Sequence, residues 1–109
     1  MNYEQVVRKV LREDGVEEST MMKMPCLRFK GEFLAMMFDK EEALIIKVAP
    51  ERVYELVAEG KGKEFNLTGK RFREWVMIPL DREEEYEALL YEGLAYARGK
   101  KQKQEKPDG

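Results

Sequence analysis

The sequence has 109 residues, of which 43% are hydrophobic and 39% charged, and its formal net charge is −2. This composition indicates one folded domain rather than a disordered chain, and the charge excludes a general attraction to nucleic acid or anionic lipid. The chain has no histidine and a single cysteine, Cys26. These counts exclude histidine-based catalysis, histidine-containing zinc sites and an internal disulfide.

The first helix is predicted at residues 2–13, where valine and leucine recur at helical spacing. Asn2 is placed to cap it, and Gln5 stands at the position of a capping-box partner. An Asp-Gly pair then ends the helix. Residues 16–23 are predicted to be a connecting segment with a short turn.

Three strands joined by short turns are predicted next. Residues 24–30 alternate apolar and charged side chains, which is typical of a half-buried strand. Residues 33–38 are apolar on both faces, which favours a central place in the sheet. A third strand is predicted at residues 43–48. The two-residue turn Gly31-Glu32 predicts antiparallel pairing of the first two strands.

The second half of the chain is predicted to contain two helices and two strands. Pro50 opens a helix at the position where its missing N–H costs nothing, and Gly60 ends it. Strands are predicted at residues 63–67 and 73–78. Asp81 is predicted to cap the last helix, which runs to the region of Arg98.

The predicted order is therefore α-β-β-β-α-β-β-α. This order predicts an α+β fold, a two-layer α/β sandwich in which helices pack on a mainly antiparallel five-stranded sheet. Residues 1–99 are expected to form the single domain, and residues 100–109 a charged, flexible C-terminal tail, because they include no apolar residue.

The string around the only tryptophan is the most specific motif of the chain. It reads Gly69-Lys70-Arg71-Phe72-Arg73-Glu74-Trp75-Val76 and is followed by Pro79. Further motifs precede and follow it: Met24-Pro25, Gly31 with Phe33 and Ala35, Leu44 to Lys47, Pro50-Glu51-Arg52 with Leu56, Gly62 with Phe65, and Ala95-Tyr96-Ala97. In this order they resemble the TfoX N-terminal domain-like (TfoX/Sxy) family over about residues 21 to 98. The chain departs from the family at Lys23-Met24, where many members have Phe-Gly, and at Phe72, where methionine is usual.

The resemblance implies a two-layer α/β fold of the kind also seen in secretion chaperones. It further implies a link to the regulation of DNA uptake, or competence, in full-length family members, which carry a second, helical domain. Because this chain matches the first domain alone, the regulatory role is not carried over to it directly.

Basic side chains near the start of the last strand are the candidate anion site. Arg71 and Arg73 lie there, and we expect Lys47 and Arg52 nearby; a guanidinium fork suits phosphate or carboxylate. The alternative, which we favour, is that these residues cover the sheet edge and pair with Glu74 or with the acidic last helix.

Trp75 is predicted to be either an interface anchor or a core residue packed against Leu89 or Leu90. Both remain open, because both faces of its strand are apolar. If all three helices lie on one sheet face, the other would expose an apolar, methionine-rich surface suited to protein contact. That surface would contain Trp75 or Val76 and Ala35, Met37 and Ile45, or the residues that alternate with these. The first helix or the 16–23 segment would cover it otherwise.

Our first functional hypothesis is a non-enzymatic binding module that meets a protein partner, or a second copy, through this sheet face, as an accessory to transcriptional regulation. The alternative is direct nucleic-acid binding through Lys70, Arg71, Arg73 and the basic tail. An enzyme is disfavoured, since no paired-carboxylate motif, phosphate loop, dinucleotide fingerprint or nucleophile elbow occurs. We expect no metal or cofactor, and we expect Cys26 to be a small buried hydrophobe.

Cellular location is inferred from the N-terminus and the apolar runs. No basic segment followed by an apolar one stands at the N-terminus. The longest apolar run, residues 33–38, is too short to cross a bilayer. We therefore expect a cytoplasmic protein with no membrane contact.

Overall fold

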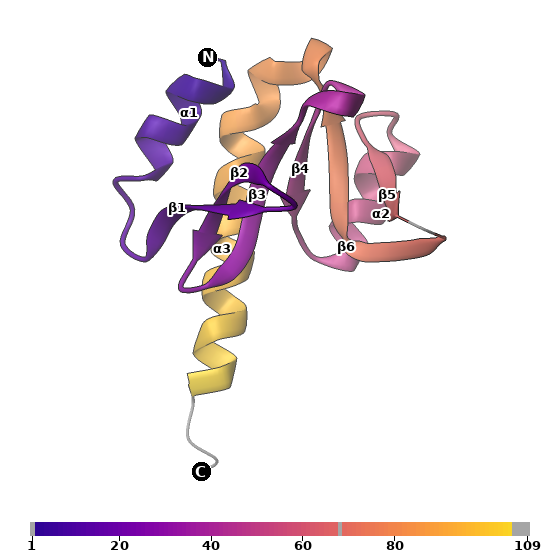
Figure 1. The fold of residues 1–109 in the computed structure, drawn as a ribbon. Coiled ribbons are helices and arrows are strands. Elements are labelled where there is room, and N and C mark those ends of the chain that lie inside the picture. Colours follow the sequence, from indigo (N-terminus) through magenta and orange to yellow (C-terminus); the bar gives the residue numbers. More distant parts are fainter. Residues whose placement is uncertain (1, 68, 106–109) are drawn as a thin grey trace.

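The computed structural model describes residues 2–67 and 69–105, apart from the side chains of residues 67, 71, 104 and 105. Its main elements are α1 (Tyr3–Val10), β1 (Val16–Met21), β2 (Met24–Phe29), β3 (Glu32–Phe38), β4 (Ala43–Lys47), α2 (Pro50–Ala58), β5 (Lys63–Leu67), β6 (Lys70–Pro79) and α3 (Tyr86–Glu105). Short 3₁₀ turns, η1 (Asp39–Glu41) and η2 (Leu80–Glu85), precede β4 and α3. The α+β class is confirmed (Figure 1).

The sheet has six strands, not the five predicted, in the antiparallel order β1-β2-β3-β4-β6-β5. The extra strand is β1, in the stretch expected to be a connecting segment, so the predicted element order was wrong. Its turn into β2 uses Met22 and Lys23 at φ 52° and 64°, angles that normally call for Asn or Gly. Since the Met-Lys pair does not signal such a turn, the hairpin was missed.

Local sequence signals explain both early helices. Asn2 and Gln5 form the predicted capping box, with 3.0 Å between each backbone nitrogen and the other residue's side-chain oxygen. Pro50 stands in the first turn of α2, as predicted. The capping box and the proline fix where each helix begins, and hence which face it turns to the sheet.

One core joins all three helices to a single face of the sheet. Val6 and Val10 of α1, Val53 of α2 and Leu90 of α3 are buried there with strand residues such as Ile46. In Figure 1, α3 crosses behind β3 and β4, while α2 lies behind β6. Apolar burial of this extent is the main stabilising term of a small domain.

A β-bulge in β3 decides which side chains face away from the helices. Leu27 pairs with Ala35 but Arg28 pairs with Phe33, so Leu34 is an extra residue. The sequence groups Ala35 and Met37 with Ile45, or the residues that alternate with these; the structure places Ala35 and Met37 on the helix side and Ile45 on the other, because Ile45 pairs with Met36. Three side chains of β3 face the other way, namely those of Phe33, Met36 and Phe38.

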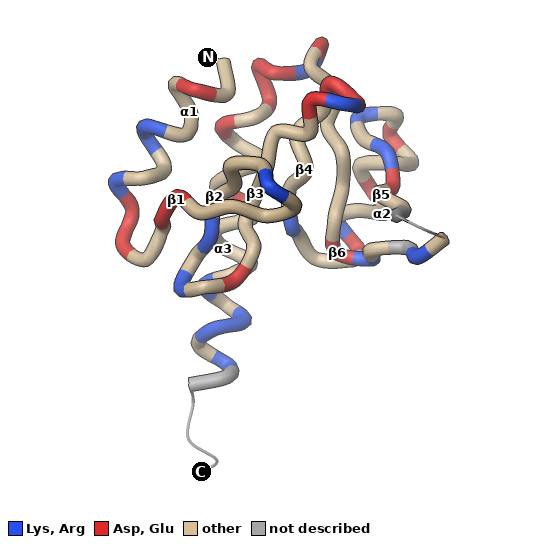
Figure 2. Tube along the Cα trace, viewed as in Figure 1, with Lys and Arg blue, Asp and Glu red and all other residues tan. Residues whose placement is uncertain are grey.

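The last helix begins and ends later than predicted: Asp81, the predicted cap, lies within η2, and α3 begins at Tyr86. It continues through residues 100–105, which were expected to belong to the tail, while residues 106–109 lie outside the described part. Figure 2 shows acidic residues near the beginning of α3 and basic residues near its end, which complements the helix dipole. Within the described residues, none of the helices combines the length and apolarity needed to cross a membrane.

Candidate functional site

The sheet face away from the helices carries a second apolar cluster, made by strand residues alone and termed here the aromatic face. Its buried members are Cys26, Phe33, Met36, Ile45 and Phe65. Half-buried side chains surround them: Met21, Met24, Phe38, Phe72, Trp75 and Met77. All six strands contribute to it. Among the described residues no helical side chain joins this cluster, so the rim of the aromatic face stays partly open to solvent.

Trp75 is at the centre of a stack of rings on the aromatic face. Its ring centroid lies 4.3 Å from that of Phe33, 4.7 Å from Phe72 and 5.3 Å from Phe65, with interplanar angles of 20–25°. Leu89 and Leu90 instead belong to the helix-side core. The structure thus places Trp75 on the face without helices, and its role as an interface anchor stays a prediction.

An irregularity in β6 makes this stack possible. Glu64 pairs with Val76 but Phe65 pairs with Phe72, so β6 has extra residues at this point. Strict alternation would put Phe72 and Trp75 on opposite faces, whereas the irregularity brings both onto the aromatic face. The strand therefore presents two aromatic rings to one side within four residues.

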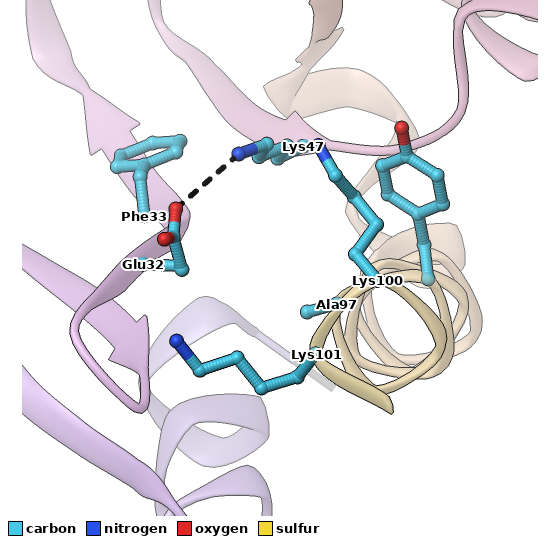
Figure 3. Close-up of a pocket in the computed structure, with 7 residues that line it drawn as sticks. Glu32, Phe33, Lys47, Ala97, Lys100 and Lys101 are labelled. Carbon is cyan, nitrogen blue, oxygen red and sulfur yellow. Dashed lines mark ion pairs between the residues drawn. The ribbon is translucent and has the colours of Figure 1, made fainter. Parts of the chain in front are cut away.

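A small hollow of about 30 Å³ adjoins the aromatic face, between the ends of β3 and β4 and the C-terminal half of α3 (Figure 3). It is termed here the lysine hollow and is lined by Glu32, Phe33, Lys47, Tyr96, Ala97, Lys100 and Lys101. Phe33 belongs to both features, since it stacks on Trp75 and also lines the hollow. Lys47 pairs directly with Trp75 across β4 and β6, so both side chains face the same side of the sheet.

The lysines of the hollow differ in how fully they are paired. Lys100 Nζ lies 2.9 Å from Glu74 Oε2, which is a full charge-assisted hydrogen bond. Lys47 Nζ lies 3.8 Å from Glu32 Oε2, which is too long for a hydrogen bond. Lys101 forms no ion pair with any side chain in the described part of the chain. Lys47 and Lys101 therefore have no hydrogen-bonded carboxylate among the described side chains, and all three ammonium groups retain N–H donors.

Glu74 is the carboxylate behind the hollow. Burial alone would raise its pKa, but hydrogen bonds from Tyr96 and Lys100 and the charges of Lys100 and Lys47 lower the pKa below its ordinary value. Burial, the hydrogen bond to Glu74 and the charge of Glu74 raise the pKa of Tyr96, so this hydroxyl stays protonated and donates a hydrogen bond to Glu74. The ionised Glu74 offsets one lysine and ties β6 to α3.

The predicted basic residues do not gather at one site. Arg52 pairs with α3 through Glu92, with 3.0 Å from Nε to Oε2 and 3.3 Å from Nη2 to Oε1, and this hydrogen bond raises the pKa of Arg52. Arg73 is exposed and does not line the hollow. The Arg71 side chain lies outside the described residues. Of the predicted cations whose side chains the structure describes, Lys47 lines the hollow, whereas Arg52 and Arg73 do not.

Three site residues were missed by the sequence analysis. Lys100 and Lys101 were assigned to a mobile tail, and Tyr96 was read only as part of a family motif. Their spacing carried a signal, because Tyr96, Ala97, Lys100 and Lys101 fall on one face of a continuous helix. Extending the last helix past Gly99 would have grouped them.

Cys26 is buried, as predicted, and is a member of the aromatic face. Burial raises the pKa of its thiol, with Arg28 acting in the opposite direction. Within the described residues no three acidic or cysteine side chains come close enough to hold a metal ion. Comparisons of the chain with protein-family models, curated proteins and solved structures gave no match.

Proposed function

We propose that this chain is a non-enzymatic binding module that holds a protein partner, or a second copy of itself, on the aromatic face. The observation that carries the proposal is Trp75, half-buried within stacked rings on a sheet face that no described helix covers. In this arrangement the helices form one layer and the sheet the other, and the partner would supply a third. The resemblance to TfoX N-terminal domain-like proteins supports a cytoplasmic module that serves as an accessory to transcriptional regulation.

The chemistry of the aromatic face suits protein contact. Tryptophan and other aromatic residues dominate the binding energy of protein interfaces, and rings already held by stacking lose little conformational freedom on binding. The surrounding methionines, Met21, Met24 and Met77, are unbranched and polarisable, so they adapt to an irregular partner surface. A rigid centre with an adaptable rim is what such an interface requires.

A pair of variants and a matched control test this proposal. Trp75→Ala removes the central ring, and Met21→Glu places a charge on the rim with little effect on the core. Tyr54→Ser is the control, since this aromatic side chain is 74% exposed on α2, away from the aromatic face. We expect light scattering of the protein, alone and with proteins captured from its native cells, to show a complex that both variants abolish and Tyr54→Ser preserves.

Two results would contradict the proposal. One is a strict monomer that captures no protein at any concentration tested. The other is a complex that persists unchanged in folded Trp75→Ala and Met21→Glu proteins, since its contacts would then lie elsewhere. Far-ultraviolet circular dichroism of each variant confirms that it is folded.

Nucleic-acid binding is the second candidate function. Lys70 Nζ lies 5.7 Å from the ring centre of Phe72, and Arg73 is exposed nearby in the same strand, so basic groups adjoin the aromatic rings. Proteins that bind single strands combine such features. We rank this function second because Trp75 is already stacked against three phenylalanine rings, and a nucleobase needs an open ring face.

A further inference from the structure

We infer that the lysine hollow is a carboxylate-binding site, which receives an acidic group of the partner while a neighbouring apolar side chain of that partner lies on the aromatic face. This inference rests on the proposed function and adds the chemical class of ligand. It assigns a binding role to Lys47, Lys100 and Lys101, with Phe33 as the wall shared by both surfaces.

The position of the hollow supports this assignment. Phe33 stacks on Trp75 at 4.3 Å on one side and lines the hollow on the other, and Lys47 stands opposite Trp75 in the adjacent strand. A ligand that covers Trp75 therefore lies beside Lys47, because the Cβ atoms of directly opposed residues are about 5 Å apart. Figure 3 shows Lys47, Lys100 and Lys101 arranged around the same space.

The charge of the hollow favours an anion although the whole chain is acidic. Three of its seven lining residues are lysines and one is a glutamate. Glu74 offsets Lys100, so about one positive charge remains after Glu32 is counted. Lys47 is only 18% exposed and its contact with Glu32 is long, so a partly desolvated ammonium has room for a closer acceptor.

The same features select a carboxylate over a phosphate. A volume of about 30 Å³ accommodates two or so water-sized groups, which matches the two oxygens of a carboxylate. A phosphate would bring a second negative charge and more oxygens against Glu32 and Glu74. One net positive charge balances a single carboxylate, whereas a dianion would remain partly uncompensated.

Two capped dipeptides test this inference directly: N-acetyl-Phe-Glu-amide and its neutral isostere N-acetyl-Phe-Gln-amide. Trp75 is the only tryptophan, so its fluorescence reports ligands on the aromatic face without a label. We expect the acidic dipeptide to bind about tenfold more tightly than the neutral one, as one charge-assisted contact predicts. Acetate should compete, and inorganic phosphate at equal ionic strength should compete less.

The variants Lys47→Met and Lys101→Gln should each remove most of this preference. Lys103→Gln is the matched control, because Lys103 is exposed on the same helix and does not line the hollow. Lys101→Gln changes a residue without an ion pair to the described side chains, so it tests the site even where Lys47→Met disturbs folding.

The possible results distinguish failure of the carboxylate site from failure of the proposed protein-binding function. If both dipeptides change the Trp75 fluorescence and bind equally well, the lysine hollow is not a carboxylate site, and the proposed protein-binding function is unaffected. A second readout is the NMR chemical shifts of the lysine side chains during titration with acetate. If these shift while neither dipeptide changes the Trp75 fluorescence, the result would support an anion site and count against the aromatic face as a docking surface. No response to any probe up to about 10 mM, enough to saturate a site with a Kd near 1 mM, would overturn the inference.

Discussion

Glu74 shows how one half-buried residue links the sheet to the last helix. Its carboxylate accepts hydrogen bonds from Tyr96 and Lys100 of α3, which together overcome the burial that would raise its pKa. A carboxyl group whose pKa is lower in the folded state stabilises the fold at pH values above its unfolded pKa. That contribution is lost as the pH falls through the folded pKa.

Replacing Tyr96 with phenylalanine tests this linkage. We expect Tyr96→Phe to raise the pKa of Glu74 towards its ordinary value of 4.5, because one donor to the ionised form is removed. The free energy of unfolding at pH 7 should fall by about 1 kcal/mol. This is less than for a fully buried hydrogen bond to a charged group, because solvent partly screens Glu74. At about pH 3 the two proteins should be closer in stability.

Carboxyl NMR titration and urea unfolding at both pH values measure these effects. Tyr91→Phe is the control, because Tyr91 is on the same helix but makes no contact with Glu74. A Glu74 pKa that stays unchanged in Tyr96→Phe would show that Lys100 and Lys47 alone hold it down.

At the scale of elements, the crossing of α3 over β4 depends on Gly93. A Cβ at this position would lie 3.0 Å from Ile46 Cγ2 and 3.0 Å from the carbonyl oxygen of Lys47. Gly99, in the same helix, has no atom within 4 Å of such a Cβ. Substituting alanine at Gly99 therefore tests helix propensity alone, whereas the same substitution at Gly93 tests helix propensity together with packing.

We expect Gly93→Ala to destabilise the protein and Gly99→Ala to stabilise it. Alanine gains about 1 kcal/mol of helix propensity at either site. At Gly93 this gain is outweighed by overpacking, typically about 1–3 kcal/mol, because a buried isoleucine and a strand backbone cannot move aside. Urea unfolding of both variants measures the difference. Equal stabilisation of both would mean that α3 is free to shift away from β4.

Much of the fold was predictable from hydrophobic periodicity and from the capping, proline and glycine residues that begin and end its elements. The capping box, Pro50 and the apolar strands were read correctly, and the strands from β2 to β6 were found, although β6 begins three residues earlier than predicted. Strand β1 was not found, because Glu17, Glu18 and Thr20 face solvent on a sheet edge and give no apolar alternation. Edge strands are commonly polar for this reason.

The candidate site was harder to predict than the fold. Trp75 stood out because of its type, yet its face depends on the β6 irregularity, and the face of Met36 depends on the extra residue Leu34. Period-two reasoning cannot locate a bulge without the partner strand. Lys100 and Lys101 were not predicted as site residues, because a stretch without apolar residues is typical of a flexible tail. In the structure this stretch continues α3.

At the scale of the whole molecule, the charge is segregated although the net charge is only −2. Figure 2 shows the basic residues of α3 gathered in its last turns and acidic residues at its other end. Helix dipoles favour this pattern in any protein, so a basic helix end does not by itself indicate nucleic acid. A chain with this balance neutralises few phosphates at once.

We therefore expect the protein to bind single-stranded DNA weakly and only at low salt. Fluorescence anisotropy with a labelled oligonucleotide should show binding near 50 mM salt that is lost by about 150 mM, since affinity falls steeply as counterions compete. Arg73→Gln should weaken the low-salt binding slightly, and Arg82→Gln, which alters a side chain already paired with Glu85, serves as its control. Binding that persists at about 150 mM salt, falls strongly in Arg73→Gln and quenches Trp75 would place bases on the aromatic face. The nucleic-acid function would then replace the protein-binding one, because the same rings cannot serve both ligands at once.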